Sequence, residues 1–266
     1  MVIISRISKG SKMDQIYIPK NRAGLGVGSY VLISPASGKQ VREIGVYYYG
    51  VRGIEPIKVR IIKEIFSEVE RLIHNWNNLI ITGSFVEEGF GFRDVDLLIV
   101  SDEKINTKIV EGAVSENLGV NAHILLVSEK MLAAGLKSDP FYLLILSKCI
   151  ARRRFVYNIK RELNYKILDL HLLKSRNLSE NFDSLSGKDK YNMVRNAVAI
   201  WLFLKNEKIG VEEVNKEIRR IFELKSVEEI KLNILGKTDF LKKYKRFYNN
   251  VFEKIMKGVK NGAKSK

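Results

Sequence analysis

The stretch LIITGSFVEEGFGFRDVDLLIV, residues 79–100, decides the interpretation of this chain. Its first hydrophobic run has the composition of a buried strand and ends in Gly83 and Ser84. After nine intervening residues, Asp94 and Asp96 open a second hydrophobic run. The pattern predicts two strands joined by a glycine-rich segment, with polar groups where the first strand ends and the second begins.

The residue types in this pattern suit a phosphate and a metal ion. Gly83 has no side chain, so a phosphate group can approach the backbone there, and the Ser84 hydroxyl can bind its oxygens. Asp94 and Asp96 are two residues apart on a strand, so their carboxylates project from the same face. Two carboxylates on one face repel each other, and a hard cation such as Mg²⁺ relieves that repulsion.

The spacing resembles the signature of the polymerase-beta nucleotidyltransferase superfamily, which is a Gly-Gly or Gly-Ser pair followed, after about nine to thirteen residues, by Asp-x-Asp within a strand. The resemblance covers residues 57–158 and includes SDPFYLLIL, which looks like a helix of small prokaryotic members. It implies transfer of a nucleoside monophosphate from an NTP to an acceptor, with release of pyrophosphate. It also implies that Asp94 and Asp96 are catalytic and bind Mg²⁺ or Mn²⁺, and that Gly83 and Ser84 bind the nucleotide.

One part of the family pattern is missing. The family draws a third carboxylate from a neighbouring strand, but the predicted strand Val120 to Val127 contains no acid. Asn121 and His123, expected on one face, are the candidates for that place, and only His123 can act as a base. The alternatives are an acid from elsewhere, a site with two acids, or a domain that binds nucleotide without turnover.

The N-terminal segment resembles the AbrB-like swapped-hairpin family. Two β-prone runs, Gln15 to Ile18 and Ser29 to Ser34, surround a segment rich in glycine. The residues that match the family are Ile18, Pro19, Lys20, Arg22, Leu25, Gly26, Gly28 and Val31. The resemblance implies a homodimer that binds DNA, and the alternative is a plain β appendage.

Beyond Arg152 helical periodicity dominates. We expect helices at Lys160 to Leu173, Lys188 to Lys205, Val211 to Leu224 and Phe240 to Val259. In the last of these, the basic residues Lys242, Lys243, Lys245 and Arg246 are candidate nucleic-acid contacts. The aromatic residues beside them either stack on bases or face the core, and helical spacing favours the core.

The sequence therefore predicts an α/β (α+β) protein in three parts. These are an AbrB-like β module at residues 1–55, a nucleotidyltransferase domain with a mixed sheet at 56–158, and a basic helical bundle at 159–266. A strand is also expected at Ile44 to Val51, and a helix at Pro140 to Ile150.

Charge and composition add the expected surroundings. The net charge is +16, and the acidic middle of the chain lies between two basic flanks, the last of which, residues 151–266, carries +14. Basic surfaces beside a metal site suit a polyanion such as RNA or DNA. A single cysteine and the lack of a signal peptide or long apolar run lead us to expect a cytoplasmic protein without a membrane partner.

The expected function is a metal-dependent nucleotidyltransferase with NTP as substrate and RNA, including tRNA, or a protein as acceptor. The alternative is a catalytically weak nucleotide-binding regulator that binds DNA through a dimeric AbrB-like module.

Overall fold

The structure is a computed structural model that describes residues 7–18, 20, 26–29, 31, 33, 45–157 and 159–264, with side chains up to residue 260. Contacts between residues divide the chain into two compact units, Met1–Glu43 and Ile44–Lys266. The two units are described separately.

The described part of the smaller unit contains a short antiparallel pair of strands. These are β1, Ile7–Ser8, and β2, Gln15–Ile16. A turn follows, in which the Ser29 N–H donates to the Gly26 carbonyl and Gly28 has φ +88°. The predicted strand Ser29 to Ser34 lies partly outside the described residues, as do Pro19, Arg22 and Leu25 of the AbrB-like pattern. The swapped hairpin therefore stays a prediction.

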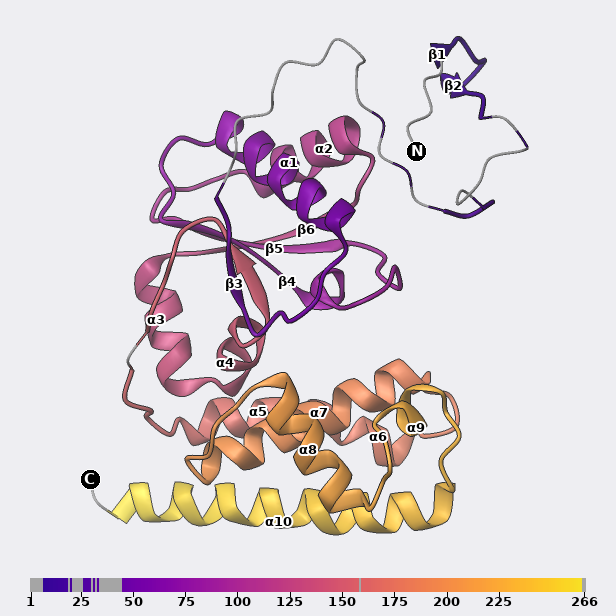
Figure 1. The fold of residues 1–266 in the computed structure, drawn as a ribbon. Coiled ribbons are helices and arrows are strands. Elements are labelled where there is room, and N and C mark those ends of the chain that lie inside the picture. The colour runs from indigo at the N-terminus through magenta and orange to yellow at the C-terminus, as the bar shows by residue number, and fades with distance from the viewer. Residues whose placement is uncertain are drawn as a thin grey trace. The chain divides into compact units, whose positions relative to one another are not determined.

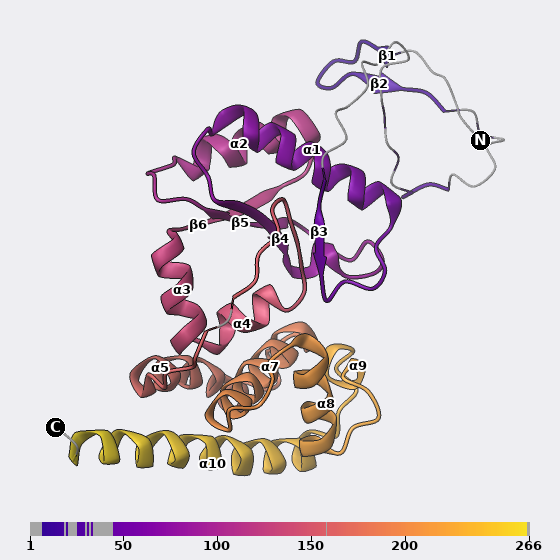
Figure 2. The ribbon, with the colours of Figure 1, turned by 60° about the vertical axis from the view of Figure 1, so that its left-hand side comes forward.

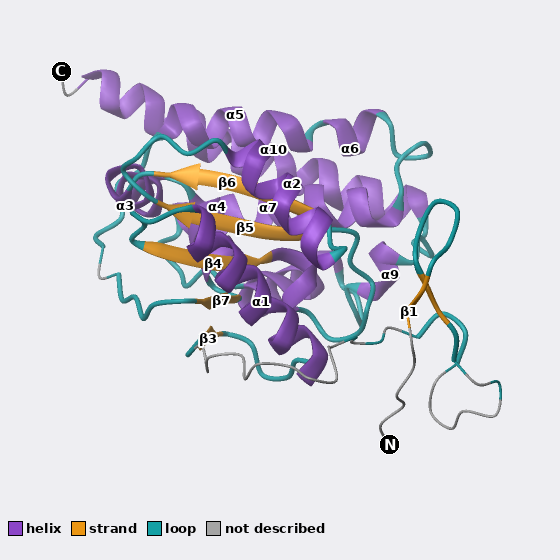
Figure 3. Cartoon of the chain, turned by 90° about the horizontal axis from the view of Figure 1, so that it is seen from above, coloured by secondary structure: helices purple, strands orange, loops and turns teal. Residues whose placement is uncertain are grey.

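The larger unit is built on a five-stranded mixed sheet with the order β3-β7-β4-β5-β6 (Figures 1 and 3). Its strands are β3 Tyr47–Tyr49, β4 Asn78–Thr82, β5 Val95–Val100, β6 Ala122–Val127 and β7 Cys149–Ala151. Only β5 and β6 pair in parallel, and the other neighbours are antiparallel. The predicted α/β class with a mixed sheet is confirmed.

Helices cover both faces of this sheet (Figures 1 and 2). On one face lie α1, Pro56–Leu72, and α2, Thr107–Leu118; on the other lie α3, Glu129–Ser138, and α4, Pro140–Leu146. Side chains of β5 alternate between the two buried clusters, with Leu97 packed toward α1 and Leu98 toward α3 and α4. By this alternation Asp96 shares the face of Leu98, which is the α4 side.

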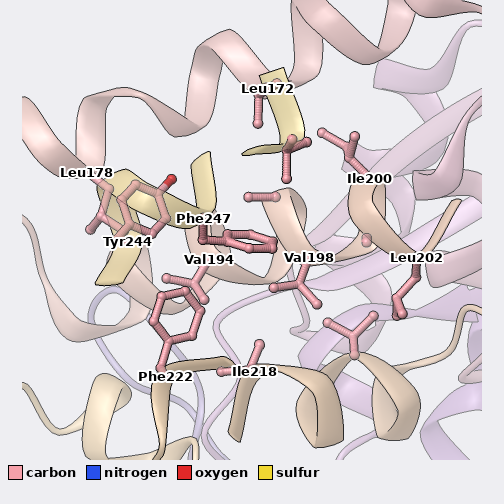
Figure 4. Close-up of a cluster of buried hydrophobic side chains, with 14 of the residues drawn as sticks. Leu172, Leu178, Val194, Val198, Ile200, Leu202, Ile218, Phe222, Tyr244 and Phe247 are labelled. Atoms are coloured by element: carbon pink, nitrogen blue, oxygen red, sulfur yellow. The ribbon is translucent and has the colours of Figure 1, made fainter. Parts of the chain in front are cut away.

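The remaining helices form a bundle around α7. Their bounds are α5 Tyr165–Ser175, α6 Asn177–Glu180, α7 Gly187–Leu204, α8 Val211–Phe222, α9 Glu228–Lys231 and α10 Lys237–Lys264. Side chains from α5 to α8 and α10 meet in one apolar cluster with α7 at its centre (Figure 4). The predicted central helix at Lys188 to Lys205 is thus confirmed. Among the helices that the structure describes, none is long and apolar enough to cross a membrane.

Two predictions about the edge of the sheet need correction. The expected helix Pro140 to Ile150 ends at Leu146, where the Ser147 hydroxyl donates to the Leu144 carbonyl, and the chain then enters β7. A continuous apolar run does not distinguish a helix from a buried strand. The strand expected at Ile44 to Val51 is present as β3, but it pairs with β7 in the main sheet, so it belongs to the larger unit and not to the module expected at residues 1–55.

The bundle core yields a stability prediction. Replacing buried Phe222 with Ala removes a ring that contacts three other aromatic rings, so we expect a loss of about 3–5 kcal/mol in the free energy of unfolding. The matched control is Phe252→Ala on α10, because that ring is 41% exposed and should cost about 0.5 kcal/mol or less. Urea denaturation measures both, and equal losses would contradict this description of the core.

Candidate active site

The candidate active site begins where the end of β4 meets the start of β5. The antiparallel register sets Thr82 opposite Asp96, so Gly83 lies against the Asp96 side chain. Gly83 has φ +77°, and a Cβ placed there would lie only 2.0 Å from Asp96 Oδ2. Glycine is therefore the residue that both the backbone conformation and the neighbouring carboxylate require.

Ser84 is held at the surface by buried neighbours. It lies in a short 3₁₀ helix, η1, Gly83–Val86, whose Phe85 and Val86 are fully buried in the cluster under α1. Its carbonyl accepts a hydrogen bond from the Glu87 N–H. On the other side, the Thr82 hydroxyl lies 3.0 Å from the Ile145 carbonyl at the end of α4. The predicted Gly83-Ser84 pair is thus a fixed turn.

Asp94 and Asp96 lie close enough to affect each other. Burial raises the pKa of Asp96 above its usual value, and the charge of Asp94 raises it further. His123 opposes this shift, with Nδ1 at 3.5 Å from Asp96 Oδ1, and so does Lys188 of α7. The two predicted carboxylates therefore share one site, and His123, on the neighbouring strand, lies at its edge.

The two candidates for the third position separate. The His123 side chain pairs with Asp96 and is 71% exposed. The Asn121 side-chain oxygen instead lies 3.5 Å from the Ser115 hydroxyl on α2, and the main-chain carbonyl of Asn121 accepts a hydrogen bond from the Val95 N–H. Of the two candidates, His123 is therefore the one that lies beside Asp96.

The donor set fits a magnesium ion that is shared with substrate better than a closed structural site. Within the described residues no group of three or more His, Cys, Asp and Glu side chains is arranged to hold a metal ion. Mg²⁺ is usually bound by one or two carboxylates together with waters and substrate phosphates. Two mutually repelling carboxylates, one of them in contact with the backbone of a glycine, suit that kind of coordination.

A buried lysine organises the segment between Ser84 and Asp94. Lys58 on α1 is fully buried, and its ammonium donates to the Glu87 carbonyl at 2.5 Å and pairs with Glu55 at 3.0 Å. Three aromatic rings surround it at 5.3–5.8 Å, namely Phe85, Phe90 and Phe92. The other Glu55 oxygen accepts from the Gly89 N–H. The gap between the two motifs is therefore an anchored loop.

The helical bundle places positively charged side chains near this edge of the sheet. Their position was not predicted from the sequence. On α7, Lys188, Tyr191 and Arg195 occupy one helical face at spacings of three and four residues. Lys188 acts electrostatically on Asp96, whereas Tyr191 and Arg195 are within the electrostatic range of Glu87. Lys231 of α9 lies 4.8 Å from the Tyr191 ring.

Arg195 is unusual among these cations. Burial lowers its pKa, and among the described residues no carboxylate forms an ion pair with its guanidinium, which contacts the Asn196 amide oxygen instead. A partly buried guanidinium without an ionic partner can receive an anionic group. The sequence feature that indicates its position is the helical spacing that places Arg195 on the same face as Lys188.

The predicted basic cluster on α10 divides between core and surface. Tyr244 and Phe247 are buried, with the Tyr244 hydroxyl donating to the Ser175 carbonyl, so neither ring can stack on a base. Lys243 pairs with Glu223 and Asp239. Lys242, Lys245 and Arg246 are exposed. Phosphate contact by these side chains stays a prediction.

Substitution of Gly83 tests the geometry of the turn. We expect Gly83→Ala to reduce the free energy of unfolding by about 1–3 kcal/mol, since its positive φ is strained for alanine and its Cβ displaces Asp96. Gly91→Ala is the control, because no atom lies within 4 Å of its added Cβ. Chemical denaturation compares the free energies of unfolding of the two variants. If Gly83→Ala is as stable as the unmodified chain, the close approach of Gly83 to the Asp96 carboxylate is refuted.

Acid denaturation tests the Lys58 anchor. Hydrogen bonds from the Gly89 N–H and Lys58 lower the pKa of Glu55 from 4.5 to about 2. The stabilisation is therefore present above pH 4.5 and is lost as the pH falls through about 2. We expect Glu55→Gln to be less stable than the unmodified chain at pH 6 and to show a shallower loss below pH 4.5. If the free energy of unfolding falls with pH at the same rate in Glu55→Gln and in the unmodified chain, this role of Glu55 is excluded.

No protein-family model matches the chain. No curated protein matches it either. The function must therefore be inferred from the side chains that surround Gly83 and Asp96.

Proposed function

We propose that the chain is a Mg²⁺- or Mn²⁺-dependent nucleotidyltransferase that moves a nucleoside monophosphate from an NTP to a hydroxyl group of an RNA acceptor. The observation that carries the proposal is the close contact between the Gly83 backbone and the Asp96 carboxylate, together with the electrostatic effect of Asp94 on Asp96. This arrangement brings the Gly83 turn and the pair of carboxylates together, which supports binding of a nucleotide phosphate and a metal ion at one place.

The residues take separate roles in the transfer. The backbone of Gly83 and the Ser84 hydroxyl bind phosphate oxygens of the NTP, and Asp94 and Asp96 hold the metal ion. When bound, the metal neutralises phosphate charge and lowers the pKa of the attacking hydroxyl. The acceptor oxygen forms a bond to the α-phosphorus, the bond from that phosphorus to the bridging oxygen breaks, and pyrophosphate leaves. His123 is the proposed recipient of the hydroxyl proton, because its ring lies beside Asp96.

The charge of the helical part favours RNA as the acceptor. Residues 151–266 carry a net charge of +14. Lys188 acts on Asp96, Arg195 acts on Glu87 in the loop before Asp94, and Lys231 lies against the Tyr191 ring. On α10, the basic residues Lys242, Lys245 and Arg246 are exposed. Such a surface attracts a phosphate backbone through counterion release. A homodimer formed through the N-terminal segment is part of the same proposal.

A second function is favoured by one observation. The described residues place no third carboxylate beside Asp94 and Asp96. A chain that binds nucleotide without efficient turnover, and binds DNA through its N-terminal segment, agrees with that observation.

Transfer of label distinguishes the two functions. The chain is incubated with each α-³²P-labelled NTP, Mg²⁺ or Mn²⁺, and total cellular RNA, beside the variant Asp94→Asn with Asp96→Asn. We expect label on RNA with the unmodified chain and a loss of at least about 10³-fold with the double variant, because both carboxylates act on the same transition state.

The controls separate binding from turnover. Glu88→Gln, an exposed acid in the intervening loop, should leave transfer unchanged. If the label appears on protein instead of RNA, the acceptor is a protein. NTP binding without any transferred label would favour the regulator, and a chain that binds none of the four NTPs would refute both functions.

A further inference from the structure

A cavity of about 610 Å³ lies on the α4 side of the sheet, next to β3 and β7. Its residues come from β3 and the segment after it, the joint between α4 and β7, the segment after β7, and the start of α8. The volume is within the range of about 300–1,000 Å³ that is typical of small-molecule sites. It does not include Asp94, Asp96 or His123.

The cavity borders the turn at Gly83. Lys148, which lines it, is bonded through its carbonyl to the Thr82 hydroxyl at 3.1 Å, and Thr82 directly precedes Gly83. The β4–β7 pairing ends at Ile81 and Ile150, so Gly83 and Lys148 follow and precede the paired ends of these two strands by two residues each. The Thr82–Lys148 hydrogen bond therefore joins the turn at Gly83 to the lining of the cavity.

Its walls are fixed in shape. Gly50 has φ +61°, and a Cβ there would lie 2.0 Å from the Ser147 carbonyl oxygen, so the backbone closes tightly at this point. The Ser147 hydroxyl accepts from the Val211 N–H, which ties the start of α8 to the end of α4. The Tyr49 hydroxyl both donates to the Phe155 carbonyl and accepts from the Phe155 N–H, and this fixes the Tyr49 ring.

The lining suits a flat, partly polar molecule. One wall is a row of rings, in which Tyr49 stacks on Phe155 at 4.1 Å and Tyr157 follows at 5.3 Å from Phe155. Leu136, Leu143 and Leu146 add an aliphatic part of the lining. Flat apolar faces of this kind bind a nucleobase by stacking and burial.

Charged side chains also line the cavity. Glu212 and Glu213 form ion pairs with Arg52 and Lys208, and their carboxylates have lone pairs left to accept hydrogen bonds from ribose hydroxyls. Lys148 has no ionic partner among the side chains that the structure describes, so its ammonium can meet a phosphate.

We infer that this cavity holds the nucleoside of the NTP, with the phosphates directed past Lys148 to Gly83 and Ser84. The inference rests on the proposed function, since it takes the occupant from that reaction. The adjacency of Lys148 to Gly83 favours the donor nucleotide over the acceptor, because base and α-phosphate of one nucleotide are separated only by its ribose.

Tyr157 is the side chain through which the inference is tested. Isothermal titration calorimetry measures binding of the four unphosphorylated nucleosides, the four NTPs, and pyrophosphate with Mg²⁺. We expect Tyr157→Ala to weaken nucleoside and NTP binding by about 5- to 150-fold, the usual effect of losing one stacked ring, and to leave pyrophosphate binding unchanged. Tyr157→Phe should retain binding, as should Tyr48→Ala, an exposed tyrosine of β3 that does not line the cavity.

A second variant avoids any loss of folding. Val156 lines the mouth of the cavity and is 78% exposed, so Val156→Glu should leave the urea midpoint unchanged. The added negative charge should weaken NTP binding more than nucleoside binding. Equal NTP affinity for Tyr157→Ala, Val156→Glu and the unmodified chain would overturn the inference.

The outcomes separate this inference from the proposed function. Nucleoside binding that depends on Tyr157, without any label transfer to an acceptor, supports the cavity and refutes the transferase. Label transfer with an NTP KM unchanged by Tyr157→Ala supports the transferase and refutes the nucleoside site. If Tyr157→Ala instead loses RNA binding and keeps NTP binding, the cavity belongs to the acceptor, and the inference is overturned.

Discussion

The register between β4 and β5 is the constraint on which the candidate site depends. Because Thr82 lies opposite Asp96, the turn that ends one strand touches the carboxylate that begins the next. A slip of one residue would turn Asp96 into the cluster under α1 and expose Leu97 in its place. Burial of alternate side chains on both faces opposes such a slip, so the packing of the sheet also fixes the geometry of its polar edge.

Lys58 adds a second constraint, on the segment between the two motifs. Its ammonium is buried among aromatic rings and satisfied by Glu55 and the Glu87 carbonyl, an arrangement that costs desolvation and leaves little freedom. The segment is thereby fixed at one end of α1. Glu87, whose carbonyl is held by Lys58, acts electrostatically on Arg195 of α7, so the anchored segment also interacts with the helical bundle.

Much of the central fold could be predicted because its signals are local. The helix predicted at Lys188 to Lys205 is observed at Gly187–Leu204, within one residue at each end, because hydrophobic pattern and end signals agree there. β7 was missed because its apolar residues continue those of α4, and only pairing with β4 distinguishes them.

The proximity of Gly83, Asp94 and Asp96 could also be predicted, because the three residues lie within a short stretch of sequence that spans two adjacent strands. Lys188 and Arg195 approach from a helix about ninety residues later, so no local pattern reports them. Asn121 and His123 were expected together, yet Asn121 precedes β6 and its side chain turns toward α2.

The position of β7 also determines the chemistry of the single cysteine. Cys149 lies between β3 and β4 under α4, and burial raises the pKa of its thiol to about 12. The thiolate that reacts with alkylating agents and oxidants is therefore almost absent at neutral pH. A cysteine introduced at an exposed position would then be the one reactive thiol of the native chain, and a spectroscopic label could be attached there without removing Cys149.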